Sequence, residues 1–207
     1  MRAVSALRNS ALALVLALVP GAALAQTTFH MEVGAAVGYR TGGSFTESAT
    51  GATYGIDDSS SIGAFADVQV GSPGLFVEVA WTRQESKVPY ENAFGKGQND
   101  VSLDSLLVGG QWDAAPRATI RPFLAALVGA TRIEVPGSAD THFTAALSGG
   151  VKLMASETFG ARLEARALAI FSGGSASGLC GPSGCTIGMT GWGTLQADFS
   201  AGLLLGF

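Results

Sequence analysis

Residues 193–207, GTLQADFSAGLLLGF, alternate between two kinds of side chain. Phe199, Ala201 and Leu203 occupy every second position, and Asp198 and Ser200 lie between them. Because successive side chains of a β-strand point to opposite faces, this pattern predicts a strand with one apolar and one polar face. Similar alternation, bounded by turn-forming residues, recurs along the chain. The predicted strands are residues 29–40, 60–71, 74–86, 100–113, 117–132, 141–155, 158–172 and 193–207.

The predicted strands are long enough to cross a bilayer, which takes about 9–11 residues in a tilted strand. Their connections alternate in length: residues 71–74, 113–117 and 155–158 are short turns, whereas 41–59, 87–99, 133–140 and 173–192 are mostly longer and polar. Barrels of the outer membrane have short turns on one side and longer loops on the other. The sequence therefore predicts an all-β fold, an eight-stranded antiparallel up-and-down transmembrane β-barrel.

The fourth predicted strand, residues 100–113, is the least regular of the eight. Leu103 alternates with Asp104, but three successive apolar residues, Leu106, Leu107 and Val108, interrupt the pattern. The register of this strand stays open at this stage, and a β-bulge would account for the interruption.

The composition excludes several classes of protein. Only 14% of the 207 residues are charged, against about 25% in soluble domains. Lys and Arg number 12 against 16 Asp and Glu, without a basic run, which argues against nucleic-acid binding. A soluble barrel would also alternate, but the polar faces carry few charges and aromatic residues lie near predicted strand ends, as at membrane interfaces. These aromatic residues are Tyr39, Trp81 and Phe171 on the loop side, and Phe76, Trp112, Phe159 and Phe207 on the turn side.

The N-terminus has the pattern of an export signal. Arg2 and Arg8 precede the short apolar run of residues 11–19, and residues 23–25 form an Ala-Leu-Ala cleavage site. We therefore expect residues 1–25 to be removed between Ala25 and Gln26, leaving residues 26–207 as the barrel domain.

The signal sequence, the alternating strands and the terminal residues 203–207 (LLLGF) together resemble the small eight-stranded outer-membrane barrels of Gram-negative bacteria, of the OmpA transmembrane-domain and OmpX kind. The resemblance implies location in the outer membrane, contact with its lipid and lipopolysaccharide, and recognition by the outer-membrane assembly machinery. In such proteins the last strand, with its C-terminal aromatic residue, is the assembly signal. The corresponding residues here are Phe199, Leu203, Leu205 and Phe207.

The polar faces of the predicted strands place charged residues inside the barrel. Acids come mainly from one wall and bases from the opposite wall, so we expect an ionic plug in the periplasmic half of the lumen, because buried charges are tolerated when they are paired. The alternative is that lumen water hydrates each charge separately. The predicted network is Glu32, Asp67, Glu78, Arg121, Lys152, Arg162, Glu164, Arg166 and Asp198.

Other chemistry-bearing residues are few. Cys180 and Cys185 lie in an outside loop of an exported protein, which predicts a disulfide; two free thiols are the alternative. His30 and His142 do not form a cluster with metal-ligand spacing, so we expect no metal and no cofactor. Lipid A deacylases of this barrel size use a His-x-Ser pair, but in the corresponding residues His142-Phe143-Thr144 a threonine takes the place of the serine. We therefore do not expect an enzyme.

Three functions remain open. The preferred one is a structural, adhesive or surface-interaction role, in which the outside loops bind a host or surface ligand, because loops on a rigid scaffold commonly carry binding. We expect such a protein to be a monomer with no nucleic-acid partner. The first alternative is a narrow pore for small solutes or ions, although the interior of an eight-stranded barrel is just wide enough for side chains to fill. The second alternative is a lipid A-modifying enzyme.

Overall fold

The structure, a computed structural model, describes residues 30–46, 53–92, 95–172, 179–181, 184–186 and 191–207. The predicted signal sequence and its cleavage site at Ala25 and Gln26 lie outside the described residues. Among the described residues, no helix is long and apolar enough to span a bilayer. The strands are β1 (Met31–Arg40), β2 (Ser44–Thr46), β3 (Thr53–Gly55), β4 (Ser59–Gln69), β5 (Leu75–Asn92), β6 (Gly95–Asp113), β7 (Ile120–Val135), β8 (Ser138–Met154), β9 (Phe159–Ser172), β10 (Leu179–Gly181), β11 (Gly184–Thr186) and β12 (Gly191–Gly206).

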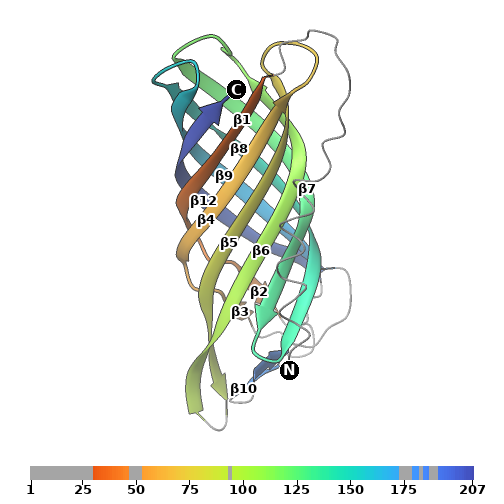
Figure 1. Ribbon diagram of the computed structural model, residues 1–207. Coiled ribbons are helices and arrows are strands. Elements are labelled where there is room, and N and C mark those ends of the chain that lie inside the picture. Colours follow the sequence, from red (N-terminus) through yellow and green to blue (C-terminus); the bar gives the residue numbers. More distant parts are fainter. Residues whose placement is uncertain (1–29, 47–52, 93–94, 173–178, 182–183, 187–190) are drawn as a thin grey trace, which may run out of the picture.

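Eight of these strands form a closed antiparallel barrel in the order β1-β12-β9-β8-β7-β6-β5-β4, which confirms the predicted fold (Figure 1). Pairing between β1 and β12 closes the barrel. Cross-strand partners followed once round from Arg40 lead back to β1 at His30, ten residues away. A stagger of this size makes the strands tilt by about 35–45° from the barrel axis.

The predicted faces are confirmed strand by strand. On β9, Leu163 and Phe171 point outward and are exposed, whereas Arg162 and Arg166 point inward and are buried. The outward row of β9 is apolar from Phe159 to Phe171, as expected of a wall that faces lipid. On β12 the inward row includes an apolar side chain, Leu204, which is completely buried in the lumen.

Two segments predicted as loops, 87–99 and 133–140, are wrong predictions, because antiparallel pairing extends far into both of them from each side. β5 and β6 pair as far as Asn92 and Gly95, and β7 and β8 pair as far as Val135 and Ser138. Gly137 takes the positive φ of 89° that the tight β7–β8 turn requires. The alternation of inward and outward side chains also continues in these segments. Their inward residues Val88, Ile133 and Val135 belong to an apolar core at the outside end of the barrel. This core comprises Ile56, Val88, Val101, Leu103, Ile133, Val135 and Ile170.

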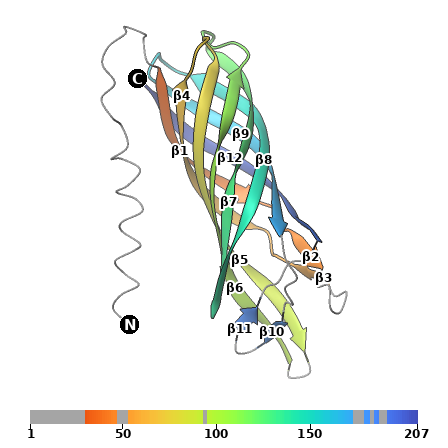
Figure 2. The same ribbon diagram turned by 90° about the vertical axis from the view of Figure 1, so that its right-hand side faces the viewer.

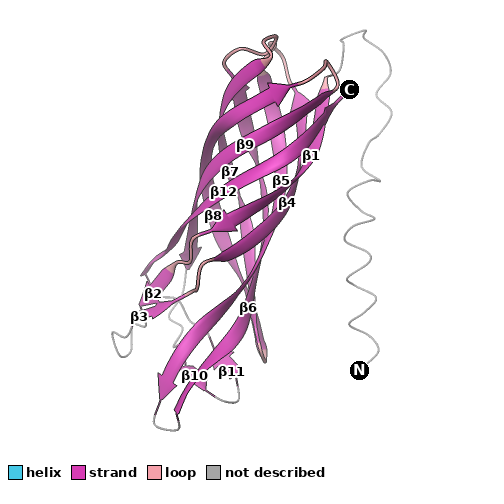
Figure 3. Ribbon diagram, turned by 90° about the vertical axis from the view of Figure 1, so that its left-hand side faces the viewer, coloured by secondary structure: helices cyan, strands magenta, loops and turns pink. Residues whose placement is uncertain are grey.

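The loops 41–59 and 173–192 contain the short hairpins β2–β3 and β10–β11. Figures 2 and 3 show both hairpins at the end of the barrel from which the β5–β6 hairpin projects. This is the outside end, because the short turns 70–74, 114–119 and 155–158 join the strands at the other end.

The structure resolves the register of β6, which the sequence left open. Its pairings with β5 and β7 run without a shift, so β6 has no bulge. Leu107 points inward and is buried, while Leu106 and Val108 point outward and are exposed. The apolar run arises because this part of the lumen is itself apolar, formed by Leu107 with Leu127 and Leu168.

Two of the aromatic residues that the sequence placed at the membrane interfaces lie elsewhere. Phe76 points into the lumen and is only 2% exposed, since it shares the inward face of β5 with Glu78. Trp81 lies in the middle of β5, because this strand extends as far as Asn92.

We predict that Phe207→Ala slows assembly but leaves the finished barrel as stable as wild type. The Phe207 side chain is 70% exposed, and its backbone, which the substitution keeps, exchanges hydrogen bonds of 2.8 and 3.1 Å with Met31. Assembly rate in cells and the thermal unfolding midpoint measure the two effects. Phe159→Ala removes another outward aromatic at the same end and is the control. Equal assembly rates for the two variants would contradict a recognition role for Phe207.

Candidate functional site

Ion pairs across the lumen form the most elaborate side-chain arrangement in the described residues. Eight of the nine predicted residues belong to one connected network, to which β1, β4 and β5 contribute acids, β7 and β8 contribute bases, and β9 contributes two bases and the acid Glu164. Its core is withdrawn from solvent, with Glu32, Asp67, Glu78 and Lys152 each at 0% exposure. The network lies toward the short-turn end of the barrel, as predicted.

Lys152 is the centre of the lower part of the network. Its Nζ donates to Glu32 at 2.5 Å and to Asp67 and Asp113 at 3.3 Å each. Arg121 adds a second cation to Glu32 at 3.3 Å. A single ammonium group therefore links three acids from three strands, which fixes β8 against β1, β4 and β6.

Arg162 and Arg166, two residues apart on β9, are the centre of the upper part. Arg162 lies 2.9 Å from Glu78 and from Glu164, and 3.3 Å from Asp67. Arg166 lies 3.0 Å from Glu78 and 2.7 Å from Glu164. Both guanidinium groups thus share the same two carboxylates, which satisfies the charges where little water reaches them.

Two aromatic rings enclose the Arg162 guanidinium. Its central carbon lies 4.4 Å from the centroid of Phe65 and 4.3 Å from that of Phe123, within the range of cation–π contacts. Phe65 comes from β4 and Phe123 from β7, two strands that β5 and β6 separate in the barrel wall. The three side chains form a transverse stack that fills the lumen at this level.

Each of these rings lies over a glycine on the neighbouring strand. Gly34 pairs with Phe65, and Gly150 pairs with Phe123. A Cβ atom at Gly34 would overlap the Phe65 ring, and one at Gly150 would lie 2.8 Å from Cε1 of Phe123. The two glycines therefore leave the space that the rings occupy.

The ninth predicted residue, Asp198, does not join this network. It accepts a hydrogen bond of 2.8 Å from Nε of Arg40, whose Nη2 donates to Thr82 at 2.7 Å. Arg40 is at the end of β1 nearer the loops, so this pair forms a separate level of the lumen. The predicted placement of Asp198 in the plug is wrong because its cross-strand partner is Arg40, while its other neighbour, Arg166, is held by Glu78 and Glu164.

The sequence prediction omitted three charged or titratable groups of the lumen: Arg40, Asp113 and His30. Arg40 shares the inward phase of Glu32, and this phase was the available signal. Asp113 was assigned to the end of a strand beside a turn, although it is only 1% exposed. His30 lies 3.2 Å from Glu32. These three residues lie at or next to strand ends, and alternation alone does not show whether a side chain there extends into the lumen far enough to meet a partner.

Toward the outside, the lumen is closed by neutral groups. Ser105, Thr131 and Thr144 form a chain of hydroxyl groups spaced 2.8 and 2.7 Å apart. Gln196 donates to Gln84 at 3.4 Å. Beyond these groups lies the apolar core around Leu103 and Ile133.

His142, the one residue considered for lipid chemistry, points into the lumen. Its neighbour Phe143 is 56% exposed on the outer wall, whereas Thr144 is buried. Nε2 of His142 has no hydrogen-bond partner in the described part of the chain. Within the same residues, no group of three His, Cys, Asp or Glu side chains could hold a metal ion.

The remaining predicted residues lie in two places. Cys180 and Cys185 are directly opposite each other in the β10–β11 ladder, and the disulfide between them stays a prediction. Phe199, Leu203, Leu205 and Phe207 share the outer face of β12, each 46% or more exposed.

A family described as outer membrane protein beta-barrel domain matches residues 11–202. The chain belongs to this family. Its location is therefore the outer membrane, as predicted. Comparison with the curated proteins gives no match.

Two solved structures are similar to the barrel. Neisserial surface protein A is 17% identical over 87% of this chain and 98% of its own length, with a TM-score of 0.57. The outer membrane protein OprG from Pseudomonas aeruginosa is 14% identical over 86% of this chain and 95% of its own, also with a TM-score of 0.57. At these identities the likeness shows the fold.

We predict that Glu78→Gln and Arg162→Gln are each destabilising by about 3–5 kcal/mol, because each removes one charge from a buried network and leaves its partners one counter-charge short. The double variant should be less destabilised than the sum of the two, since Glu78 and Arg162 contact each other. Denaturant unfolding in lipid vesicles measures this coupling. Arg83→Gln with Glu85→Gln removes an exposed pair as the control, and should cost less than about 1 kcal/mol. Wild-type stability of both single variants would show that the lumen charges are hydrated separately.

We further predict that Gly34→Ala and Gly150→Ala each destabilise the barrel by about 1–3 kcal/mol, the usual cost of overpacking a filled interior. Gly110→Ala is the matched control, because a Cβ there meets nothing within 4 Å. Unfolding of the three variants side by side measures this cost: the same midpoint for all three would mean that the Phe65 and Phe123 rings, and the Leu203 and Leu163 carbonyl groups beside the two glycines, move aside freely.

Proposed function

We propose that this outer-membrane barrel is a closed scaffold that presents binding surface outside the cell, and that it neither conducts solutes nor catalyses a reaction. The observation that carries this proposal is the filled lumen. The ionic network and the Phe65–Arg162–Phe123 stack occupy one end, and the apolar core around Leu103 occupies the other. An eight-stranded barrel has little space left once such side chains fill it.

At the outside end, one pair of strands projects well beyond the rest of the barrel and so away from the membrane. Pairing of β6 with β7 stops at Ser102 and Glu134, but β5 and β6 continue as a two-stranded ribbon to Asn92 and Gly95. The ribbon projects beyond the rest of the barrel (Figure 3). The apolar core beneath it makes its base rigid, and rigidly held outside elements commonly carry binding. We propose the β5–β6 ribbon as the principal contact surface.

Two measurements test this function. Purified protein in a planar bilayer should give no steady single-channel steps, whereas a narrow pore would give them. Bacteria expressing the full chain should bind cultured host cells or abiotic surfaces more than a deletion strain does. A variant in which a two-residue turn replaces residues 89–98, and which keeps the core residue Val88, should lose this binding and still reach the outer membrane. Steady conductance, or full adhesion of that variant, would overturn the corresponding half of the proposal.

A further inference from the structure

The apolar rows on the outer wall differ in length from strand to strand. On β9 the row has seven residues from Phe159 to Phe171, and on β12 it has seven from Leu195 to Phe207. On β5 it has four, from Leu75 to Trp81, and the same face then continues with charged residues. These are Arg83, Glu85 and Lys87.

The β6 row repeats the pattern of β5. Its four outward residues from Trp112 to Leu106 are followed by Asp104, Ser102 and Asp100. The charged residues of the two strands are paired on the outer face: Arg83 lies 3.3 Å from Asp104 and 2.9 Å from Glu85. On β7, Arg132 pairs with Glu134 at 2.7 Å. One side of the barrel thus becomes ionic on the outer face well below the rim.

These row lengths can be expressed as heights. A tilted strand gains about 2.4 Å of height per residue. The apolar wall is therefore about 29 Å tall on β9 and β12 but about 14 Å on β5 and β6, whereas outer-membrane barrels carry an apolar band of about 25 Å. The tall wall spans the hydrocarbon layer, and the short wall does not.

Most of the difference lies at the outer leaflet. From Ala169, cross-strand partners lead through Ala145 and Val128 to Val108 on β6. Because of the stagger, Val108 lies about 9 Å lower than Ala169, three strands away. Four residues along β6 toward the outside end, from Val108 to Asp104, make up this height. Asp104 therefore lies at about the level of Ala169. An ionised pair on one side is thus level with an alanine row on the other.

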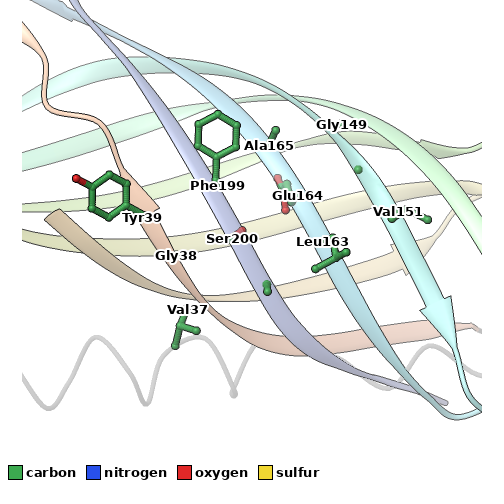
Figure 4. A pocket seen from close by; sticks show the side chains of 12 residues that line it. Val37, Gly38, Tyr39, Gly149, Val151, Leu163, Glu164, Ala165, Phe199 and Ser200 are labelled. Atoms are coloured by element: carbon green, nitrogen blue, oxygen red, sulfur yellow. The ribbon is translucent and has the colours of Figure 1, made fainter. Parts of the chain in front are cut away.

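The tall wall has the surface that acyl chains fit. Figure 4 shows Val37, Tyr39, Leu163 and Phe199 around a shallow groove of about 620 Å³ over β1, β12, β9 and β8. Small side chains form its floor, including Ala165. Above the groove, Phe143, Phe171 and Leu195 are 56%, 38% and 72% exposed, and the two phenyl rings lie 5.8 Å apart.

We propose that the outer leaflet meets this barrel at an uneven level. Its acyl chains cover the β8–β9–β12 wall as far as Phe143, Phe171 and Leu195, and its headgroup layer descends to Arg83, Asp104 and Arg132 on β5–β7. Ionised side chains are costly in hydrocarbon, and exposed phenyl and leucyl groups are costly in water. The barrel satisfies both conditions by tilting or by thinning the leaflet beside β5 and β6. The lipids beside β8, β9 and β12 belong to the same outer leaflet that surrounds the rest of the barrel.

Spin labels at matched heights test the proposal. Single cysteines at Asp104 and Ala169, in full-length protein with Cys180→Ser and Cys185→Ser, are labelled in phospholipid vesicles. The label at Ala169 should collide mainly with oxygen, and the label at Asp104 mainly with a water-soluble nickel chelate. Labels at Val79 and Ala165, lower on the same two sides, should both favour oxygen. Equal accessibility at Asp104 and Ala169 would overturn the uneven boundary. Shielding of Ala169 from both reagents would show that protein, and no lipid, covers the wall.

A second variant tests the same surface by bilayer thickness. Arg83→Leu with Asp104→Leu extends the short apolar wall by one outward residue on each strand. The ratio of folding yields in 18-carbon to 12-carbon phospholipid vesicles should rise at least twofold over wild type. Glu85→Leu with Glu134→Leu is the control, since these residues lie above charged positions that remain, and its ratio should stay at the wild-type value. An unchanged ratio in the first variant contradicts the proposal.

Discussion

Hydrogen bonds between β1 and β12 close the strand ladder, and the rest of the structure depends on this closure. Backbone N–H and C=O groups have no partners in hydrocarbon, so a strand can cross a bilayer only in a sheet without open edges. With eight strands and a stagger of ten residues, closure leaves an interior about as wide as the side chains that fill it. Long inward side chains therefore reach across the lumen, as Arg162 on β9 does to Glu78 on β5.

That narrow interior explains the arrangement of charges. Glu32, Asp67 and Glu78 project from neighbouring strands, and without Lys152 and Arg162 they would repel one another in a poorly solvated space. The arginine is held further by two phenyl rings, and the rings are admitted by two glycines. Ionic, aromatic and backbone constraints thus act on one side chain, Arg162. Its replacement should therefore lower the stability of the whole barrel.

The outer face has a different physical logic. Its residues are selected by the layer they contact, so the level at which apolar residues give way to charged ones records the edge of the membrane. This edge is lower on β5 and β6 than on β9 and β12. The β5–β6 ribbon, which carries the proposed contact surface, rises from the side where the apolar wall is shortest, so more of its length lies outside the hydrocarbon.

The sequence by itself determined the barrel, the number of its strands and the side of the wall on which Arg162 or Phe199 lies, because a period of two residues is a local property of extended backbone. It also indicated which charges lie in the lumen. Only the tertiary structure decided that Arg40 pairs with Asp198, that Lys152 joins three acids, and that residues 87–92 and 95–99 are strand. These outcomes depend on the stagger of the closed ladder, which sets the heights at which inward side chains from distant strands meet. No local pattern in the sequence contains that stagger, since it arises only when the last strand pairs with the first.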